Sequence, residues 1–93
     1  MRFTWHEAKR ISNLKAHGLD FVDAVKAFEG PTYTYEDDRF SYSDQRFVTL
    51  GLLSGVVVSL VHTESEYEIH CISFRKATKR EQRILLESLK DGS

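Results

Sequence analysis

The sequence is poor in cysteine and proline, with one of each, and it contains no long hydrophobic run. A single cysteine excludes an internal disulfide and any zinc cluster built from several cysteines. That residue, Cys71, lies in an apolar pattern typical of a strand, so we expect it to be buried in the core. No apolar run approaches the roughly 20 residues of a membrane span, and the N-terminal MRFTWHEAKR lacks the apolar core of a signal peptide. We therefore expect a soluble, cytoplasmic protein without a membrane partner.

The chain also lacks an excess of charge of one sign. Its formal net charge is -1, so overall charge gives no argument for a nucleic-acid partner, and only local clustering of cations can support one. With 41% hydrophobic and 12% aromatic residues, the composition is that of a folded protein. No repeat, low-complexity segment or linker divides the 93 residues, so we predict one domain spanning residues 1–93.

A first helix is predicted near the N-terminus. Thr4 and Glu7 form a candidate capping box, and good helix formers continue through Ala16. Gly18 then suits the left-handed position that ends a helix. The inward-facing positions of this helix should be Ala8, Ile11 and Leu14.

Two further helices are predicted from similar signals. Asp20 is a good N-cap for a second helix, which Gly30-Pro31 stops. Near the C-terminus, Thr78 and Glu81 form another capping box, which opens a third helix. The apolar residues that recur at helical spacing are Phe21, Ala24, Val25 and Phe28 in the second helix, and Ile84, Leu85 and Leu89 in the third.

Between the second and third helices the pattern becomes that of β-strands. Runs rich in β-branched and aromatic residues are separated by polar turns such as Ser54-Gly55, and a short additional strand can form at residues 2–5. We predict an α+β fold in which an antiparallel four-stranded meander carries the helices on one face. The predicted strands are residues 32–36, 46–52, 56–63 and 68–74; the third is apolar on both faces and should be central.

Cations gather where the last strand gives way to the C-terminal helix. Glu81 is the single acid among them, and lysines and arginines at a helix N-terminus oppose the helix dipole. Departures from local rules are expected at functional sites, and an anionic partner such as a phosphate backbone would turn this penalty into affinity. A solvated basic helix end is the alternative. The clustered cations are Arg75, Lys76, Lys79, Arg80 and Arg83.

Several distinctive motifs occur along nearly the whole chain: Trp5-His6-Glu7-Ala8-Lys9, the run NLKAHGLDF at residues 13–21, Gln45-Arg46-Phe47, and ISFRKATKRE at residues 72–81. Together these motifs resemble those of the BrnT family of toxins. The chain departs from the family's pattern at His6, where an aspartate is usual. It departs again at Leu85 or Leu86, where the family often has a tyrosine, so a phenol is missing there.

This resemblance implies a bacterial type II toxin with a RelE-like ribonuclease fold. It further implies neutralisation by a ribbon-helix-helix antitoxin, BrnA, in a two-to-two complex that binds its own operator DNA mainly through the antitoxin. The expected activity is metal-independent RNA cleavage that arrests translation and growth.

Metal-free RNA cleavage requires deprotonation of the 2′-hydroxyl, stabilisation of the charge on the phosphorane, and protonation of the leaving oxygen. Arg75 is the first candidate for charge stabilisation, because it leaves the last strand facing opposite to the apolar Ile72 and Phe74. Its planar fork can bind two phosphate oxygens; pairing with Glu64 or Glu66 is the alternative. The catalytic candidates are Arg75, Lys79 and Arg80 for charge, and His17 and Glu64 for proton transfer. The substrate-binding candidates are Lys15, Tyr42, Lys76, Arg83 and His62, the last of which could also transfer a proton.

Structural roles also explain several of these residues. His17 stands beside Gly18, where a protonated imidazole is favoured by the dipole at a helix C-terminus. His62 and Glu64 have the same parity on one strand and could both be solvated near its end. Tyr42, in a polar loop, could stack on an RNA base or cover the edge of the core.

No metal or other cofactor is expected. The histidines have no ligand spacing, and the consecutive acids Glu36, Asp37 and Asp38 suit a solvated turn or a contact for a basic antitoxin segment. Two other function classes remain open. One is a non-enzymatic module that binds nucleic acid through its basic helix end or captures a partner on an edge strand. The other is a degenerate toxin that acts only in an operator-binding repressor complex.

Overall fold

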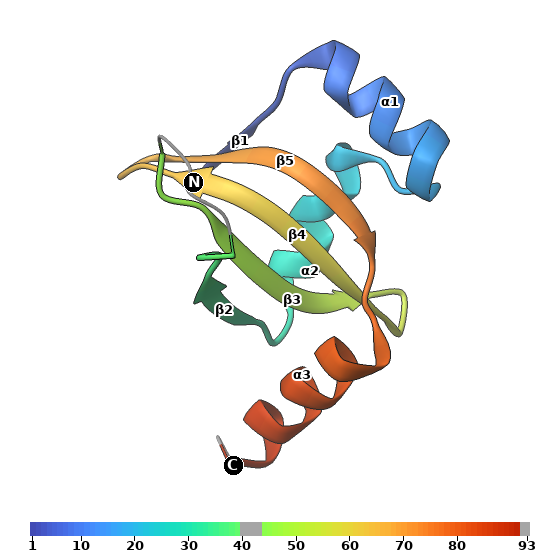
Figure 1. The fold of residues 1–93 in the computed structure, drawn as a ribbon, viewed down its shortest axis with the longest axis vertical. Coiled ribbons are helices and arrows are strands. Elements are labelled where there is room, and N and C mark those ends of the chain that lie inside the picture. The colour runs from blue at the N-terminus through green and yellow to red at the C-terminus, as the bar shows by residue number, and fades with distance from the viewer. Residues whose placement is uncertain (40–43, 92–93) are drawn as a thin grey trace.

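The computed structural model describes residues 1–39 and 44–91, which form an α+β fold as predicted. Within those residues, one sheet has the strand order β1-β5-β4-β3-β2 (Figure 1). None of the helices in this part of the chain is both long and apolar enough to cross a membrane. The elements are β1 (Arg2–Thr4), α1 (Glu7–His17), the 3-10 helix η1 (Phe21–Asp23), α2 (Ala24–Glu29), β2 (Tyr33–Glu36), β3 (Phe47–Leu53), β4 (Val56–Glu64), β5 (Glu68–Lys76) and α3 (Lys79–Asp91).

The sheet is mixed rather than purely antiparallel. Strands β2 to β5 form the predicted meander, but the additional N-terminal strand β1 pairs with β5 in parallel, with Phe3 opposite Ile69. Strands joined by a tight turn must be antiparallel, whereas β1 joins the free edge of β5 from a distant part of the chain. The central position predicted for β4 is confirmed, since it lies between β3 and β5.

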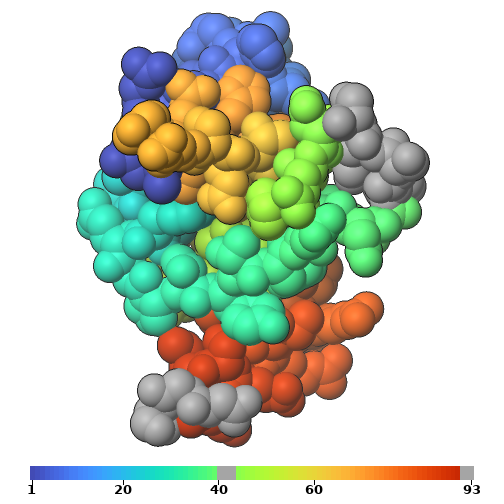
Figure 2. Space-filling view, turned by 90° about the vertical axis from the view of Figure 1, so that its left-hand side faces the viewer, coloured from blue at the N-terminus to red at the C-terminus, as the bar shows by residue number. Residues whose placement is uncertain are grey.

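The prediction that all helices pack on one face of the sheet is wrong. In Figure 1, α2 crosses behind the strands, and α3 lies at the end of the molecule opposite α1, an arrangement that Figure 2 shows from the side. Both faces of the sheet must be shielded from water by helices, because β4 carries apolar side chains on each face. The core under η1 and α2 contains Phe21, Ala24, Ala27, Val58, Leu60, Ile69, Cys71 and Phe74. The core under α3 contains Val48, Leu50 and Leu85.

A β-bulge in β5 decides which face Arg75 occupies. The register with β4 shifts by one residue between Cys71 and Ser73, so Ile72 is an extra residue in β5. Cys71 and Phe74 consequently both point into the core under α2, and the predicted burial of Cys71 is confirmed. Arg75 follows Phe74 and therefore points toward the face that α3 covers.

Of the three helix-capping signals predicted within the first 20 residues, two are confirmed. Gly18 ends α1 with a φ of 73°, and the side chain of Asp20 accepts a hydrogen bond that caps η1. The predicted capping box of Thr4 and Glu7 is wrong, because Thr4 belongs to β1 and its hydroxyl pairs with His70 Nδ1 at 2.9 Å. Strand pairing thus determines the position of Thr4.

The buried face of α1 is also different from the predicted one. Ala8, Ile11 and Leu14 are exposed, the last two by 45% and 40%, whereas Asn13 is only 6% exposed. Its amide donates to the Phe74 carbonyl at 2.8 Å and accepts from the Phe74 N–H at 3.0 Å. Asn13 therefore takes the place of a neighbouring strand at the edge of β5, beyond the short β1.

The second predicted helix begins as a 3-10 turn, and this turn changes which residues face the core. Val25 is 40% exposed although it was predicted to point inward, and Ala27 is buried instead. A 3-10 turn has about three residues rather than 3.6, so it rotates the following helix relative to an uninterrupted one. Ala27 packs directly on β3, where a Cβ added to Gly51 would lie 2.9 Å from the Ala27 carbonyl oxygen.

His62 is buried on this same face of the sheet. It is 1% exposed, its ring packs against Phe28 and Phe47, and its Nε2 pairs with the Thr49 hydroxyl at 2.8 Å. Burial lowers the pKa of His62 below 6.5, and the negative charge of Glu64 opposes this only in part. The folded state therefore holds a neutral imidazole.

This burial predicts an acid-sensitive stability. The unfolded chain protonates His62 below about pH 6.5 while the folded chain resists protonation, so the unfolding free energy falls as the pH drops through this value, by up to about 1.4 kcal/mol per pH unit. His62→Gln should weaken this slope between pH 7.5 and 5.5, as measured by urea denaturation. Ser12→Ala, which changes an exposed residue without a titratable group, should keep the wild-type slope. Equal slopes for His62→Gln and wild type would contradict the prediction.

Candidate active site between the sheet and the C-terminal helix

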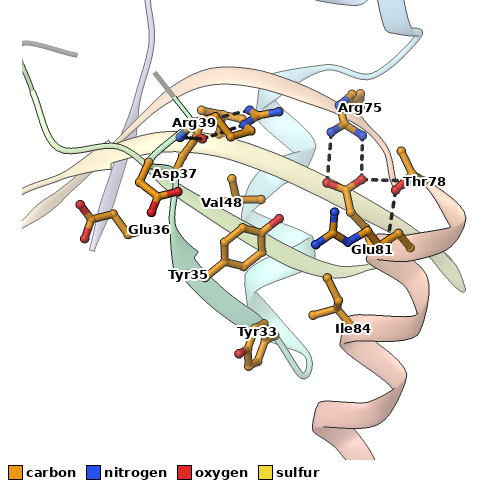
Figure 3. Close-up of a pocket in the computed structure, with 13 residues that line it drawn as sticks. Tyr33, Tyr35, Glu36, Asp37, Arg39, Val48, Arg75, Thr78, Glu81 and Ile84 are labelled. Carbon is orange, nitrogen blue, oxygen red and sulfur yellow. Dashed lines mark hydrogen bonds and ion pairs between the residues drawn. The ribbon is translucent and has the colours of Figure 1, made fainter. Parts of the chain in front are cut away.

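A pocket of about 540 Å³ lies between β2, β5 and the first turns of α3 (Figure 3). One wall is formed by β2 and the acidic residues that follow it, and the opposite wall by Arg75 and the start of α3. The floor is apolar and belongs to the core under α3. The lining residues are Tyr33, Tyr35, Glu36, Asp37, Asp38, Arg39, Val48, Val61, Arg75, Thr78, Arg80, Glu81 and Ile84.

Arg75 is held in this pocket by Glu81. Its Nη1 lies 2.9 Å from Oε1 and its Nη2 lies 3.1 Å from Oε2, a two-point ion pair. The predicted capping box places the acid there: the Thr78 N–H donates to Glu81 Oε1 at 2.8 Å, and the Glu81 N–H donates to Thr78 Oγ1 at 3.2 Å. The same two residues thus start α3 and orient the arginine.

The remaining donors of Arg75 form a free edge. A guanidinium has five N–H donors in one plane, and three of them serve Glu81 and the Lys76 carbonyl. The other two, on Nε and Nη2, lie on the same edge of the plane and have no hydrogen-bond partner among the described residues. The side chain is 29% exposed and lines the pocket. Two parallel N–H groups match two oxygens of a phosphate.

Glu81 is ionised and fully engaged. Burial by itself would raise the pKa of Glu81, but the hydrogen bonds from Arg75 and Thr78 outweigh burial and lower it. The Ser59 hydroxyl adds a longer contact of 3.4 Å to Oε2. A carboxylate with these partners is a poor proton acceptor, so its role is to position Arg75.

The opposite wall carries a second acid–arginine pair and two tyrosines. Asp37, whose side chain is 1% exposed, accepts bonds from Arg39 at 2.8 and 3.1 Å, and these bonds hold the pKa of Asp37 below its usual value. Tyr33 and Tyr35 are two residues apart on β2 and lie on the same face of the strand, with their ring centres 6.2 Å apart. Burial first, and then the charge of Glu81, raises the pKa of Tyr35.

Two of the residues predicted for the site, Arg75 and Arg80, line the pocket. The acid that Arg75 pairs with is Glu81 rather than Glu64 or Glu66. Other predicted cations are exposed near the pocket but do not line it: Lys76 at the end of β5, and Lys79 and Arg83 in the first turns of α3.

The remaining predicted residues lie elsewhere. Lys15 and His17 are exposed in the last turn of α1, on the helix at the opposite end of the molecule from α3. Glu64 is exposed at the end of β4, beside a separate hollow. His62 was expected near solvent, but it is buried under α2 and cannot reach an RNA on the pocket side. Tyr42 lies outside the described residues.

Sequence reasoning missed Glu81 and Tyr35 as site residues. Glu81 did carry a signal, since it is the single acid within the basic segment, but it was interpreted only as a helix cap. Tyr35 shares a face of β2 with Tyr33, yet no local pattern indicates that this face looks toward α3. Within residues 1–39 and 44–91, no three His, Cys, Asp or Glu side chains gather in a way that could hold a metal ion.

Comparison with known protein families identifies the class to which this chain belongs. Residues 5–81 match the family described as "Ribonuclease toxin, BrnT, of type II toxin-antitoxin system". A search among curated proteins gave no match. Because the family match spans most of the 93 residues, the chain belongs to the BrnT family, and the resemblance seen in its motifs is confirmed. Membership in this family implies an RNA substrate and an antitoxin partner.

Proposed function

We propose that the chain is an endoribonuclease that cleaves RNA without a metal ion in the pocket between β2, β5 and α3. The observation that supports this most strongly is Arg75, which lines the pocket, is held in place by Glu81 and has two N–H donors without a partner among the described residues. A phosphate bound there would have two hydrogen bonds and a full positive charge at its oxygens. Charge stabilisation of this kind is usually the largest single contribution to phosphoryl-transfer catalysis.

Arg80 adds a second cation to the same pocket from the first turn of α3. Together the two arginines can stabilise the negative charge that develops when the 2′-oxygen attacks phosphorus. The expected products are a 2′,3′-cyclic phosphate and a 5′-hydroxyl. Lys76, Lys79 and Arg83, exposed nearby, are proposed to bind flanking phosphates of the RNA.

The partners and the biological role are proposed from the family resemblance. The antitoxin would be a BrnA-like ribbon-helix-helix protein, in a two-to-two complex that binds operator DNA through the antitoxin. Free toxin would arrest translation and growth in the cytoplasm, and its fold would be RelE-like. The exposed acids Glu36 and Asp38 at the pocket wall suit a contact with a basic antitoxin segment.

The test is cleavage of RNA by the purified chain in the presence of EDTA, followed by analysis of the product ends. We expect cleavage that EDTA does not reduce, with cyclic phosphate ends. Cleavage that disappears in EDTA would contradict metal independence. RNA that stays intact with folded protein, both alone and with ribosomes, would contradict ribonuclease activity and favour the binding-module function.

A further inference from the structure

Cleavage in the pocket needs a group that protonates the leaving 5′-oxygen. The donors predicted from sequence do not lie there: His17 is on α1, Glu64 is at the end of β4, and His62 is buried on the other face of the sheet. Within the pocket, Glu81 and Asp37 have lowered pKa values and carry no proton at neutral pH. Arginines do not give up a proton in proteins.

Tyr35 is placed to supply this proton. It lies on β2 across the pocket from Arg75, half-buried against the core under α3, and Figure 3 shows its hydroxyl pointing toward the Arg75–Glu81 pair. The charges of Arg75, Glu81 and Arg39 all act on this phenol. Tyr33, two residues earlier on the same face, is 41% exposed and lies farther from the pair (Figure 3).

We propose that Tyr35 is the catalytic acid that protonates the leaving oxygen. This inference rests on the proposed ribonuclease function. In the reaction, the 2′-hydroxyl loses its proton to solvent water or hydroxide, and the 2′-oxygen forms a bond to phosphorus. The bond from phosphorus to the 5′-oxygen breaks, and that oxygen takes the proton of the Tyr35 hydroxyl. The resulting phenolate regains a proton from solvent.

The chemistry of the phenol fits a donor rather than an acceptor. Its pKa is raised, so the hydroxyl keeps its proton at neutral pH. The departing alkoxide is more basic than a phenolate, which makes the proton transfer favourable. The positive charge of Arg75, which acts on this phenol across the pocket, favours the phenolate that forms.

The experiment uses a short RNA whose scissile bond has been mapped with the wild-type chain. Two versions are compared under single-turnover conditions, one natural and one with sulfur in place of the 5′-bridging oxygen. A thiolate leaves without protonation, so it removes the need for an acid. The proteins are wild type, Tyr35→Phe, the matched control Tyr33→Phe, and Arg75→Ala. Circular dichroism melting checks that each is folded.

We expect Tyr35→Phe to cleave the natural RNA about 100-fold more slowly than wild type, and to come within about 10-fold of wild type on the sulfur-containing RNA. Tyr33→Phe should stay within about 3-fold on both, and Arg75→Ala should be slow on both. Binding of a 2′-O-methyl RNA by Tyr35→Phe should match wild type.

Tyr35→Phe that cleaves the natural RNA at the wild-type rate, or is equally impaired on both RNAs, would overturn this assignment while the ribonuclease function stands. A wild-type chain that cleaves neither RNA would overturn the ribonuclease function together with the assignment.

Discussion

Arg75→Ala should lower RNA cleavage by about 1,000-fold and abolish growth arrest on expression. The variant loses the two N–H groups and the charge that we place at the scissile phosphate. Its fold should persist, because Glu81 keeps its bonds to the Thr78 N–H and, at 3.4 Å, to Ser59. The lost ion pair should reduce the unfolding free energy by about 1–2 kcal/mol.

Two further variants test what is specific to Arg75. One distinguishes its planar guanidinium from its charge, and the other distinguishes Arg75 from the remaining cations of the basic segment. Arg75→Lys keeps the charge but not the planar fork, so its cleavage rate should fall between those of wild type and Arg75→Ala. Lys76→Ala changes the next residue, which is exposed, does not line the pocket and is proposed to bind only a flanking phosphate. It should weaken RNA binding and lower cleavage by about 10-fold or less, far less than Arg75→Ala. A fully toxic Arg75→Ala would show that the catalytic centre lies elsewhere.

Asn13→Ala should destabilise the fold by about 3 kcal/mol. The substitution removes the bonds of the amide to the Phe74 N–H, to the Phe74 carbonyl and to the Leu19 carbonyl at 3.0 Å. Those groups stay largely buried where α1 covers β5. The melting temperature should fall by roughly 12–24 °C, since about 1 kcal/mol corresponds to 4–8 °C in a domain of this size.

Two control variants accompany this prediction. One changes a neighbouring residue of the same helix turn, and the other makes a different substitution at Asn13. Ser12→Ala removes an exposed hydroxyl that bonds only the Lys9 carbonyl, and should change the unfolding free energy by less than about 0.5 kcal/mol. Asn13→Asp loses both amide donors and brings a negative charge to two carbonyls, so it should be at least as unstable as Asn13→Ala. Near-wild-type stability of Asn13→Ala would mean that this amide does not hold α1 on the sheet.

Much of the secondary structure could be predicted from the sequence because its signals are local. The capping box of Thr78 and Glu81, the left-handed Gly18 and the alternating strand runs each depend on neighbours within a few residues. The buried face of α1 could not be predicted this way. Its apolar residues are exposed, and a single amide satisfies the edge of a strand 61 residues away in the sequence.

For the candidate site as well, residues marked by local patterns could be predicted and residues placed by the tertiary structure could not. Arg75 and Arg80 were identified from a run of cations at a helix start, which is a local feature. Tyr35 was not, because its role depends on β2 lying across the sheet from β5, with two strands between them. His62 and Glu64 were candidates because an imidazole and a carboxylate can transfer protons, and residue type says nothing about which face of β4 a helix will cover.

By itself, the sequence determined the helix and strand segments, the α+β class, the basic segment with Arg75, and the motifs that place the chain in the BrnT family. The tertiary structure alone decided the parallel β1, the helices on both faces, and the opposition of Tyr35 and Arg75 across one pocket. For Arg75, the physical reason is the bulge at Ile72, where one extra residue turns it from the face under α2 to the face under α3. Such a register shift is set by side chains packing on both faces of the sheet at once. Local sequence patterns carry no information about that packing.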